Sequence, residues 1–217
     1  MVDPLDPDPL DQSKAQQSPL SPPLLIVLSG PSGVGKDAAL SDLKGLDRDW
    51  HFVVTATTRP QRPSERDGVD YEFLDTQTFL RMKEQGEFLE CAEVYGRWYG
   101  VPRSQVRRAL EAGRDVILKV DVQGAETIRG LAPEAVFIFM VPGSFDDLRK
   151  RLGQRMSESP PELELRLRTA REELDRAHEF DYQVVNHDGR LGQVIAEIDA
   201  IIASEKARDV PRMVRFT

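Results

Sequence analysis

The feature that most constrains the fold is a glycine-rich segment that follows a short apolar run. Residues 24–28 read Leu-Leu-Ile-Val-Leu, and soon after comes Gly30-Pro31-Ser32-Gly33-Val34-Gly35-Lys36. A continuous apolar run of this length predicts a strand buried on both faces, as in a parallel sheet. Glycines let several backbone N–H groups point at one phosphate, and the lysine adds a positive charge at the start of a helix. The segment therefore predicts a phosphate-binding P-loop in an α/β fold.

The rest of the chain alternates between apolar runs and helical patterns. Three more runs predict buried strands at residues 115–120, 135–141 and 181–185. Apolar residues recur at helical spacing in residues 38–44, 76–87, 104–112, 144–154, 162–178 and 191–208. This alternation predicts a P-loop NTPase fold with a central parallel sheet flanked by helices. Residues 55–102 instead contain short, aromatic, β-prone pieces, which indicates an inserted lobe.

Composition limits the class of protein. The 217 residues suffice for one folding unit, and the single cysteine cannot form an internal disulfide. A net charge of −8 argues against nucleic acid as a partner. No apolar run is long enough for a membrane span, and the N-terminus lacks the pattern of a secretory signal. We therefore expect a cytoplasmic protein with no membrane partner, either a monomer or a homo-oligomer.

One position departs from the P-loop pattern. The residue after the lysine is usually Ser or Thr, whose hydroxyl binds Mg²⁺, but here it is Asp37. A carboxylate is a good oxygen ligand for Mg²⁺, although it brings negative charge close to the phosphates. Asp37 is therefore a candidate ligand for an Mg²⁺ cofactor.

A second motif identifies the family that the chain resembles. Residues 57–73 fit T-T-R-x-x-R-x-x-E-x-x-G-x-x-Y-x-F at every fixed position. Together with the P-loop this motif resembles guanylate kinases, over roughly residues 23–208. The resemblance implies transfer of the γ-phosphate of Mg·ATP to GMP, and also to dGMP, with ATP and GMP as the binding partners.

The resemblance also implies which residues bind GMP. Glu90 corresponds to the carboxylate that reads guanine, because it can accept hydrogen bonds from N1–H and the 2-amino group together. Arginine side chains can offer forked donors to the GMP phosphate, and tyrosine can add a hydroxyl donor. The full expected set is Thr55, Arg59, Arg62, Glu65, Tyr71, Glu90, Tyr99 and Asp121.

On the ATP side, the expected residues are Gly30, Pro31, Ser32, Gly33, Val34, Gly35, Lys36, Asp37 and Asn186. The expected catalytic residues are Lys36 and the two lid arginines, Arg155 and Arg166, whose charges would stabilise the transferring phosphate. Pro160-Pro161 indicates a loop within the lid. Four neighbouring arginines are interpreted as solvated helix charges: Arg149, Arg151, Arg168 and Arg171.

These assignments divide the chain into parts. Residues 1–23 hold six prolines and four aspartates, which predicts a disordered tail. A guanylate kinase-like domain follows over 24–208, with its core in 24–54, 103–150 and 171–208. Within it, 55–102 form a GMP-binding lobe and 151–170 a lid, and 209–217 form a C-terminal tail.

A second departure accompanies Asp37. Residues 119–124 resemble the family motif D-x-D-x-x-G, but the first acid is replaced by Lys119. In P-loop folds the end of this strand adjoins the P-loop helix. We therefore expect Lys119 and Asp37 to lie within ion-pair reach of each other.

Two other functions remain open. Asp37 also fits a related P-loop kinase that acts on a sugar phosphate such as ribose 1,5-bisphosphate, although that activity has no use for Glu90. A noncatalytic guanylate-kinase-like interaction module would have little need for the intact glycines and Lys36.

Overall fold

The computed structural model describes residues 21–94, 96–153 and 160–216. Its larger part is built on a five-stranded sheet, in which every pair of neighbouring strands is parallel. In spatial order the strands are β2 (Trp50–Phe52), β7 (Asp115–Lys119), β1 (Leu25–Ser29), β8 (Val136–Pro142) and β9 (Tyr182–Asn186). The central strand β1 is buried along its whole length, as its continuous apolar sequence predicts.

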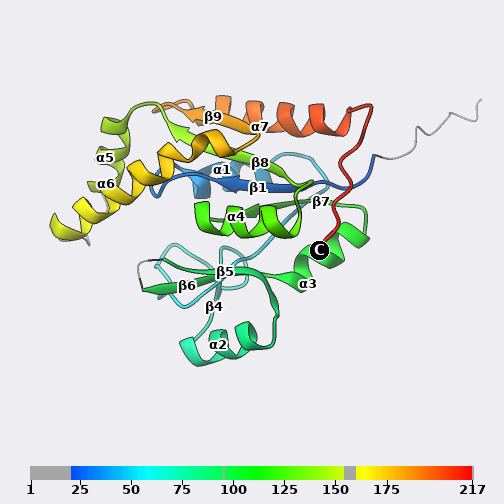
Figure 1. Cartoon of the computed structure of the whole chain (residues 1–217). Coiled ribbons are helices and arrows are strands. Elements are labelled where there is room, and N and C mark those ends of the chain that lie inside the picture. Colours follow the sequence, from blue (N-terminus) through cyan, green and yellow to red (C-terminus); the bar gives the residue numbers. More distant parts are fainter. Residues whose placement is uncertain (1–20, 95, 154–159, 217) are drawn as a thin grey trace, which may run out of the picture.

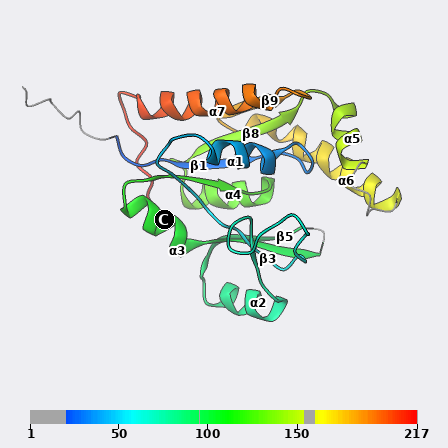
Figure 2. The same cartoon turned by 180° about the vertical axis from the view of Figure 1, so that it is seen from behind.

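Helices cover both faces of this sheet, with α1 and α7 on one face and α3 and α4 on the other (Figures 1 and 2). Alternate side chains of β1 point to opposite faces, so Ile26 belongs to one hydrophobic cluster and Val27 to the other. These helices are α1 (Lys36–Lys44), α3 (Arg103–Glu111), α4 (Val122–Leu131) and α7 (Leu191–Lys206). The predicted α/β fold with a central parallel sheet flanked by helices is confirmed.

The inserted lobe, residues 55–102, forms its own small sheet below the main one in Figure 1. Its strand order is β4 (Glu72–Phe73), β3 (Ala56–Thr57), β6 (Arg97–Pro102) and β5 (Phe88–Val94). Helix α2 (Thr76–Glu84) closes the lobe by burying Phe79, whose ring stacks on Phe88 with centroids 4.5 Å apart. The lobe therefore has a separate hydrophobic core.

Two helices project from the β8–β9 connection, namely α5 (Phe145–Gly153) and α6 (Pro160–Asp175), and a 3₁₀ turn (Ala177–Glu179) follows them. The loop predicted at Pro160-Pro161 is wrong, because α6 begins at Pro160. Proline is tolerated in the first helical turn, where its missing N–H would have no helical partner anyway. Both helices also run across the lid boundaries predicted at residues 151 and 170.

Residues 211–216 carry no helix or strand but lie against the core. Arg212 binds Glu205 of α7 at 2.8 Å and donates to the carbonyl of Ala135 at 2.9 Å. Val214 packs against the cluster on the α3 side of the sheet. The predicted disordered tail lies outside the described residues, apart from 21–23. None of the described helices has the length and apolar character needed to cross a membrane.

Candidate active site

The candidate site is a cavity of about 780 Å³ between the P-loop, the end of β7 and the inserted lobe. Most of the residues predicted from the sequence line it. From the P-loop, α1 and α6 these are Pro31, Ser32, Gly33, Gly35, Lys36, Asp37 and Arg166. From the inserted lobe and the start of α4 they are Thr55, Arg59, Arg62, Tyr71, Glu90, Tyr99 and Asp121. Residues far apart in the sequence thus meet in one space.

The P-loop has the backbone geometry that a phosphate cradle requires. Gly35 has φ +106°, and a Cβ atom there would lie 2.7 Å from Nδ2 of Asn186. The Lys36 ammonium group donates to the carbonyls of Gly30 and Pro31, so it lies folded over the loop. Burial lowers the pKa of Lys36, since the charged form loses contact with water. A phosphate bound in the loop would give this cation the negative partner that the backbone carbonyls only partly replace.

Two side chains support the P-loop from behind. Asn186, at the end of β9, donates to the Val34 carbonyl at 2.7 Å, and Arg151 of α5 donates to the same oxygen at 3.0 Å. Arg151 also pairs with Asp188. The interpretation of Arg151 as a solvated charge is therefore wrong, because its side chain is largely buried against the loop. Asn186 does not line the cavity.

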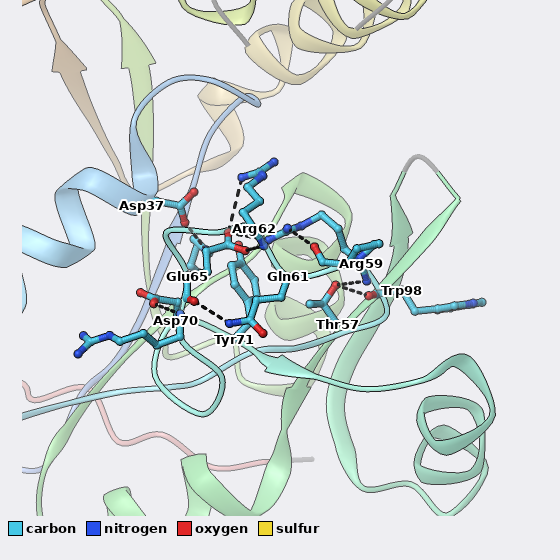
Figure 3. Close-up of polar contacts among 12 residues, drawn as sticks. Asp37, Thr57, Arg59, Gln61, Arg62, Glu65, Asp70, Tyr71 and Trp98 are labelled. Atoms are coloured by element: carbon cyan, nitrogen blue, oxygen red, sulfur yellow. Dashed lines mark hydrogen bonds and ion pairs between the residues drawn. The ribbon is translucent and has the colours of Figure 1, made fainter. Parts of the chain in front are cut away.

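The lobe presents a pair of arginines organised by one carboxylate (Figure 3). Oε1 of Glu65 accepts from the Arg59 guanidinium at 2.8 Å, and Oε2 accepts from the Arg62 backbone N–H at 2.9 Å. The Arg62 guanidinium is half-exposed and lies 3.7 Å from the same carboxylate. Tyr71 lies beneath Arg59, whose guanidinium carbon is 5.3 Å from the ring centroid. Glu65 itself does not line the cavity, so its carboxylate holds Arg59 and Arg62 in position from outside it.

Glu90 of β5 is a buried carboxylate at the other end of the cavity, only 6% exposed. Among the described residues its Oε2 has no hydrogen-bond partner. Burial, and secondarily the negative charge of Asp121, raise the pKa of Glu90 to about 8. A buried acceptor of this kind is suited to a ligand that supplies hydrogen-bond donors.

Gly124 of α4 is a site residue to which the sequence analysis assigned no role. A Cβ atom at this position would lie 2.9 to 3.0 Å from the carboxyl atoms of Glu90. Asp121 caps the same helix by accepting from the Gly124 N–H at 2.8 Å. A glycine is thus needed at position 124, because a larger side chain would collide with the Glu90 carboxyl group. The sequence does not show this requirement, since it arises from a tertiary contact.

The expected ion pair between Asp37 and Lys119, the two residues that depart from the expected motifs, is confirmed. The Lys119 ammonium group, at the end of β7, donates to Oδ1 of Asp37 in the first turn of α1 and also to the hydroxyl of Tyr71. The Lys119 side chain is 14% exposed, against 62% for Asp37. The pair therefore joins the P-loop helix to the main sheet and to the lobe.

Of the two arginines expected in a lid, the structure describes one. Arg166 of α6 donates to Oγ of Ser32 at 2.6 Å, which places its guanidinium beside the P-loop. Arg155 lies outside the described residues. Glu173, two turns further along α6, also lines the cavity, and burial raises its pKa although Lys36 opposes the shift. Glu173 could not be identified from the sequence, because it has no distinctive spacing within a helix rich in charge. Gly30 and Val34 do not line the cavity.

Comparisons with known proteins identify the family. The family model described as guanylate kinase matches residues 23–205. Guanylate kinase 2, chloroplastic/mitochondrial, from Oryza sativa subsp. japonica is 46% identical over 91% of this chain and 71% of its own length. Guanylate kinase from a Synechococcus strain is 40% identical over 92% of this chain and 91% of its own.

A solved structure extends the agreement to the fold. The crystal structure of guanylate kinase from Anaplasma phagocytophilum matches with a TM-score of 0.72 and 31% identity, covering 88% of this chain and 89% of that one. These matches cover the stretch of sequence that contains both the P-loop and the T-T-R motif. The chain therefore belongs to the guanylate kinase family.

Proposed function

We propose that this protein transfers the γ-phosphate of ATP to GMP, giving ADP and GDP. The proposal rests on one observation: a single cavity is lined both by Lys36 of the P-loop and by Glu90 of the inserted lobe. A phosphate cradle alone would fit many P-loop enzymes. The buried carboxylate beside an arginine pair adds recognition of a nucleobase and of a second phosphate.

Glu90 would select guanine by its charge. Its ionised carboxylate accepts from N1–H and the 2-amino group of guanine, whereas adenine presents an acceptor at N1 that a carboxylate repels. Thr55, which is 6% exposed and lines the same cavity, would add a hydroxyl beside the base. The phosphate of GMP would lie between the two arginines of the lobe and the hydroxyls of Tyr71 and Tyr99.

In the reaction, the bond between the β–γ bridging oxygen of ATP and the γ-phosphorus breaks, and an oxygen of the GMP phosphate forms the new bond. The P-loop N–H groups and Lys36 would hold the β- and γ-phosphates in line with the acceptor. Arg166 lies above Ser32 of the P-loop and would stabilise the charge on the equatorial oxygens. Arg155 is proposed as its partner in the lid, residues 151–170, which would exclude water on closure.

The site also fits a divalent cation supplied with the nucleotide. Mg²⁺ usually keeps several waters and binds through one or two carboxylates together with substrate phosphates. Asp37 lines the cavity beside Lys36, and its side chain is 62% exposed although Oδ1 accepts from Lys119, so its carboxylate is the group that would hold the ion while keeping that contact. When bound, the cation would neutralise charge that develops on the phosphates.

A coupled assay of ADP release tests the proposal. With Mg·ATP as donor, the acceptors would be GMP, dGMP, AMP, UMP and ribose 1,5-bisphosphate. Turnover should be fastest with GMP or dGMP and lost in Lys36→Met. Preference for the sugar bisphosphate would instead support the alternative kinase suggested by Asp37, and absence of turnover with every acceptor would support a noncatalytic module.

A further inference from the structure

The contacts of Lys119 connect the two halves of the cavity. Its ammonium group touches Asp37, which follows the P-loop lysine, and Tyr71, which belongs to the acceptor side. The Nζ atom also lies 4.3 Å from the centroid of the Tyr71 ring. Figure 3 shows Asp37 on α1 facing the loop that carries Arg62, Glu65 and Tyr71. A single cation thus bridges elements that come from three separate parts of the chain.

Lys119 remains charged although it is largely buried. Its side chain is only 14% exposed, and its ammonium group donates to two oxygen atoms, Oδ1 of Asp37 and the hydroxyl of Tyr71. Burial raises the pKa of Tyr71, so its hydroxyl keeps its proton at neutral pH. The contact is therefore between an ammonium cation and a neutral phenol.

The direction of this hydrogen bond determines what Tyr71 can do. An ammonium group has three donors and no acceptor, so the Tyr71 oxygen must accept from Lys119. The hydroxyl proton of Tyr71 is then directed elsewhere. Tyr71 lines the cavity together with Arg59 and Arg62, so a phosphate held by these arginines would be the natural acceptor of that proton.

We propose that Lys119 is a positioning residue for the acceptor phosphate, acting through the Tyr71 hydroxyl, and that Asp37 holds its ammonium group in place. The proposal rests on the function proposed above, with GMP as the acceptor. Lys119 fixes Tyr71 as a hydrogen-bond donor and adds positive charge beside the acceptor phosphate. Because Asp37 also begins the P-loop helix, the same chain of contacts links the donor site to the acceptor site.

Calorimetric titration of GMP in the absence of ATP tests this role. Lys119→Met keeps the length of the side chain but removes its donors, and Tyr71→Phe removes the hydroxyl alone. Each should weaken GMP binding by about 10- to 100-fold, the range expected for a hydrogen bond to a charged group. The double variant should bind GMP only slightly more weakly than the single variant with the lower affinity, because both changes break the same chain of contacts. Lys119→Arg should restore most of the affinity.

A matched control separates positioning from general stability. Lys206 is another partly buried lysine that pairs with an aspartate at 2.9 Å, namely Asp115, which begins β7 and so lies at the other end of that strand from Lys119. Lys206→Met should leave GMP affinity within about twofold of the unaltered protein, since no substrate contact depends on it. Thermal melts of every variant would show that each is folded at the titration temperature.

The outcomes separate this proposal from the proposed function. If the unaltered protein bound no GMP, both would be wrong. If it bound GMP and Lys119→Met bound it equally well, the positioning role alone would be wrong. Strict additivity of Lys119→Met and Tyr71→Phe would also overturn it, because the lysine would then act independently of the tyrosine.

Discussion

Replacing Glu90 with Gln should remove a loss of stability that the nucleotide-free protein undergoes as the pH rises, while damaging GMP binding. Glu90 is buried, and its pKa is raised from 4.5 to about 8. Below pH 4.5 the carboxyl group is protonated in both the folded and the unfolded chain. As the pH rises to 8, the unfolded chain loses this proton while the folded protein retains it, so stability falls. The difference in pKa corresponds to at most about 5 kcal/mol.

Glutamine has nearly the same shape but does not titrate. The free energy of unfolding of Glu90→Gln, relative to the unaltered protein, should therefore increase from pH 5 to pH 8.5. Any constant cost of burying the amide cancels in this comparison, because only the pH-dependent part is predicted. Unfolding by urea at pH 5, 7 and 8.5 measures it.

The same pKa predicts that GMP binding releases a proton. At pH 7 about a tenth of Glu90 is ionised in the nucleotide-free protein, and guanine requires the ionised form. GMP affinity should therefore rise about fivefold between pH 7 and pH 8, a range in which the GMP phosphate stays a dianion. Glu90→Gln should bind GMP at least about 100-fold more weakly, without this pH dependence, because an amide cannot accept both guanine donors.

Titration in two buffers with different ionisation enthalpies counts the released proton. Glu87→Gln is the matched control, since Glu87 is an exposed residue three positions earlier and should change neither quantity. Two results would refute the reasoning: a stability difference that does not vary with pH, or GMP binding without proton release. Either would mean that Glu90 is already ionised in the free protein.

Three further variants test other parts of the structure. Arg62→Ala should weaken GMP binding by about 1.5–3 kcal/mol in calorimetry with little effect on unfolding, because its guanidinium is half-exposed; intact affinity would remove it from the site. Gly124→Ala should raise the KM for GMP without lowering the melting temperature, because a methyl group would press on the Glu90 carboxylate while alanine favours the helix. Arg212→Ala should lower the free energy of unfolding by about 2–3 kcal/mol in urea, since it leaves Glu205 buried with fewer partners, and GMP affinity should not change.

The elements that could be predicted from the sequence are those with a strong local signal. The apolar runs of β1, β7 and β8 specify buried strands of a parallel sheet, and the structure has them within one residue. The strand expected at 181–185 is also present as β9, but it lies at the edge of the sheet with Val185 exposed, so its predicted burial is wrong. Strand β2 was missed because it has only three residues, Trp50–Phe52, at the edge of the sheet. Helix α4 was missed because Gly124 and Gly130 weaken its local helical preference.

The site shows a similar limit. The P-loop and the arginine pair have fixed spacing in the sequence, so both could be located before the structure. Arg151 could not be assigned, because its partner Val34 is 117 positions away and nothing in its helix distinguishes it from other charges. Gly124 is required only because the Glu90 carboxylate from another element approaches it. Both roles depend on tertiary contacts rather than on local pattern.

The pairing of Asp37 with Lys119 was predictable for a topological reason. β1 and β7 are parallel neighbours with Leu28 opposite Lys119, so β7 ends beside the loop that leads into α1. The charge of each residue offsets the electrostatic cost of the other. With an acid at both positions, Asp37 would crowd the phosphates with further negative charge, while Lys119 without Asp37 would leave a second buried cation near Lys36 without that anion. On electrostatic grounds the two residues therefore have to be exchanged together. The same dependence extends to Tyr71, whose hydroxyl can accept from Lys119 only when the inserted lobe is folded against the sheet.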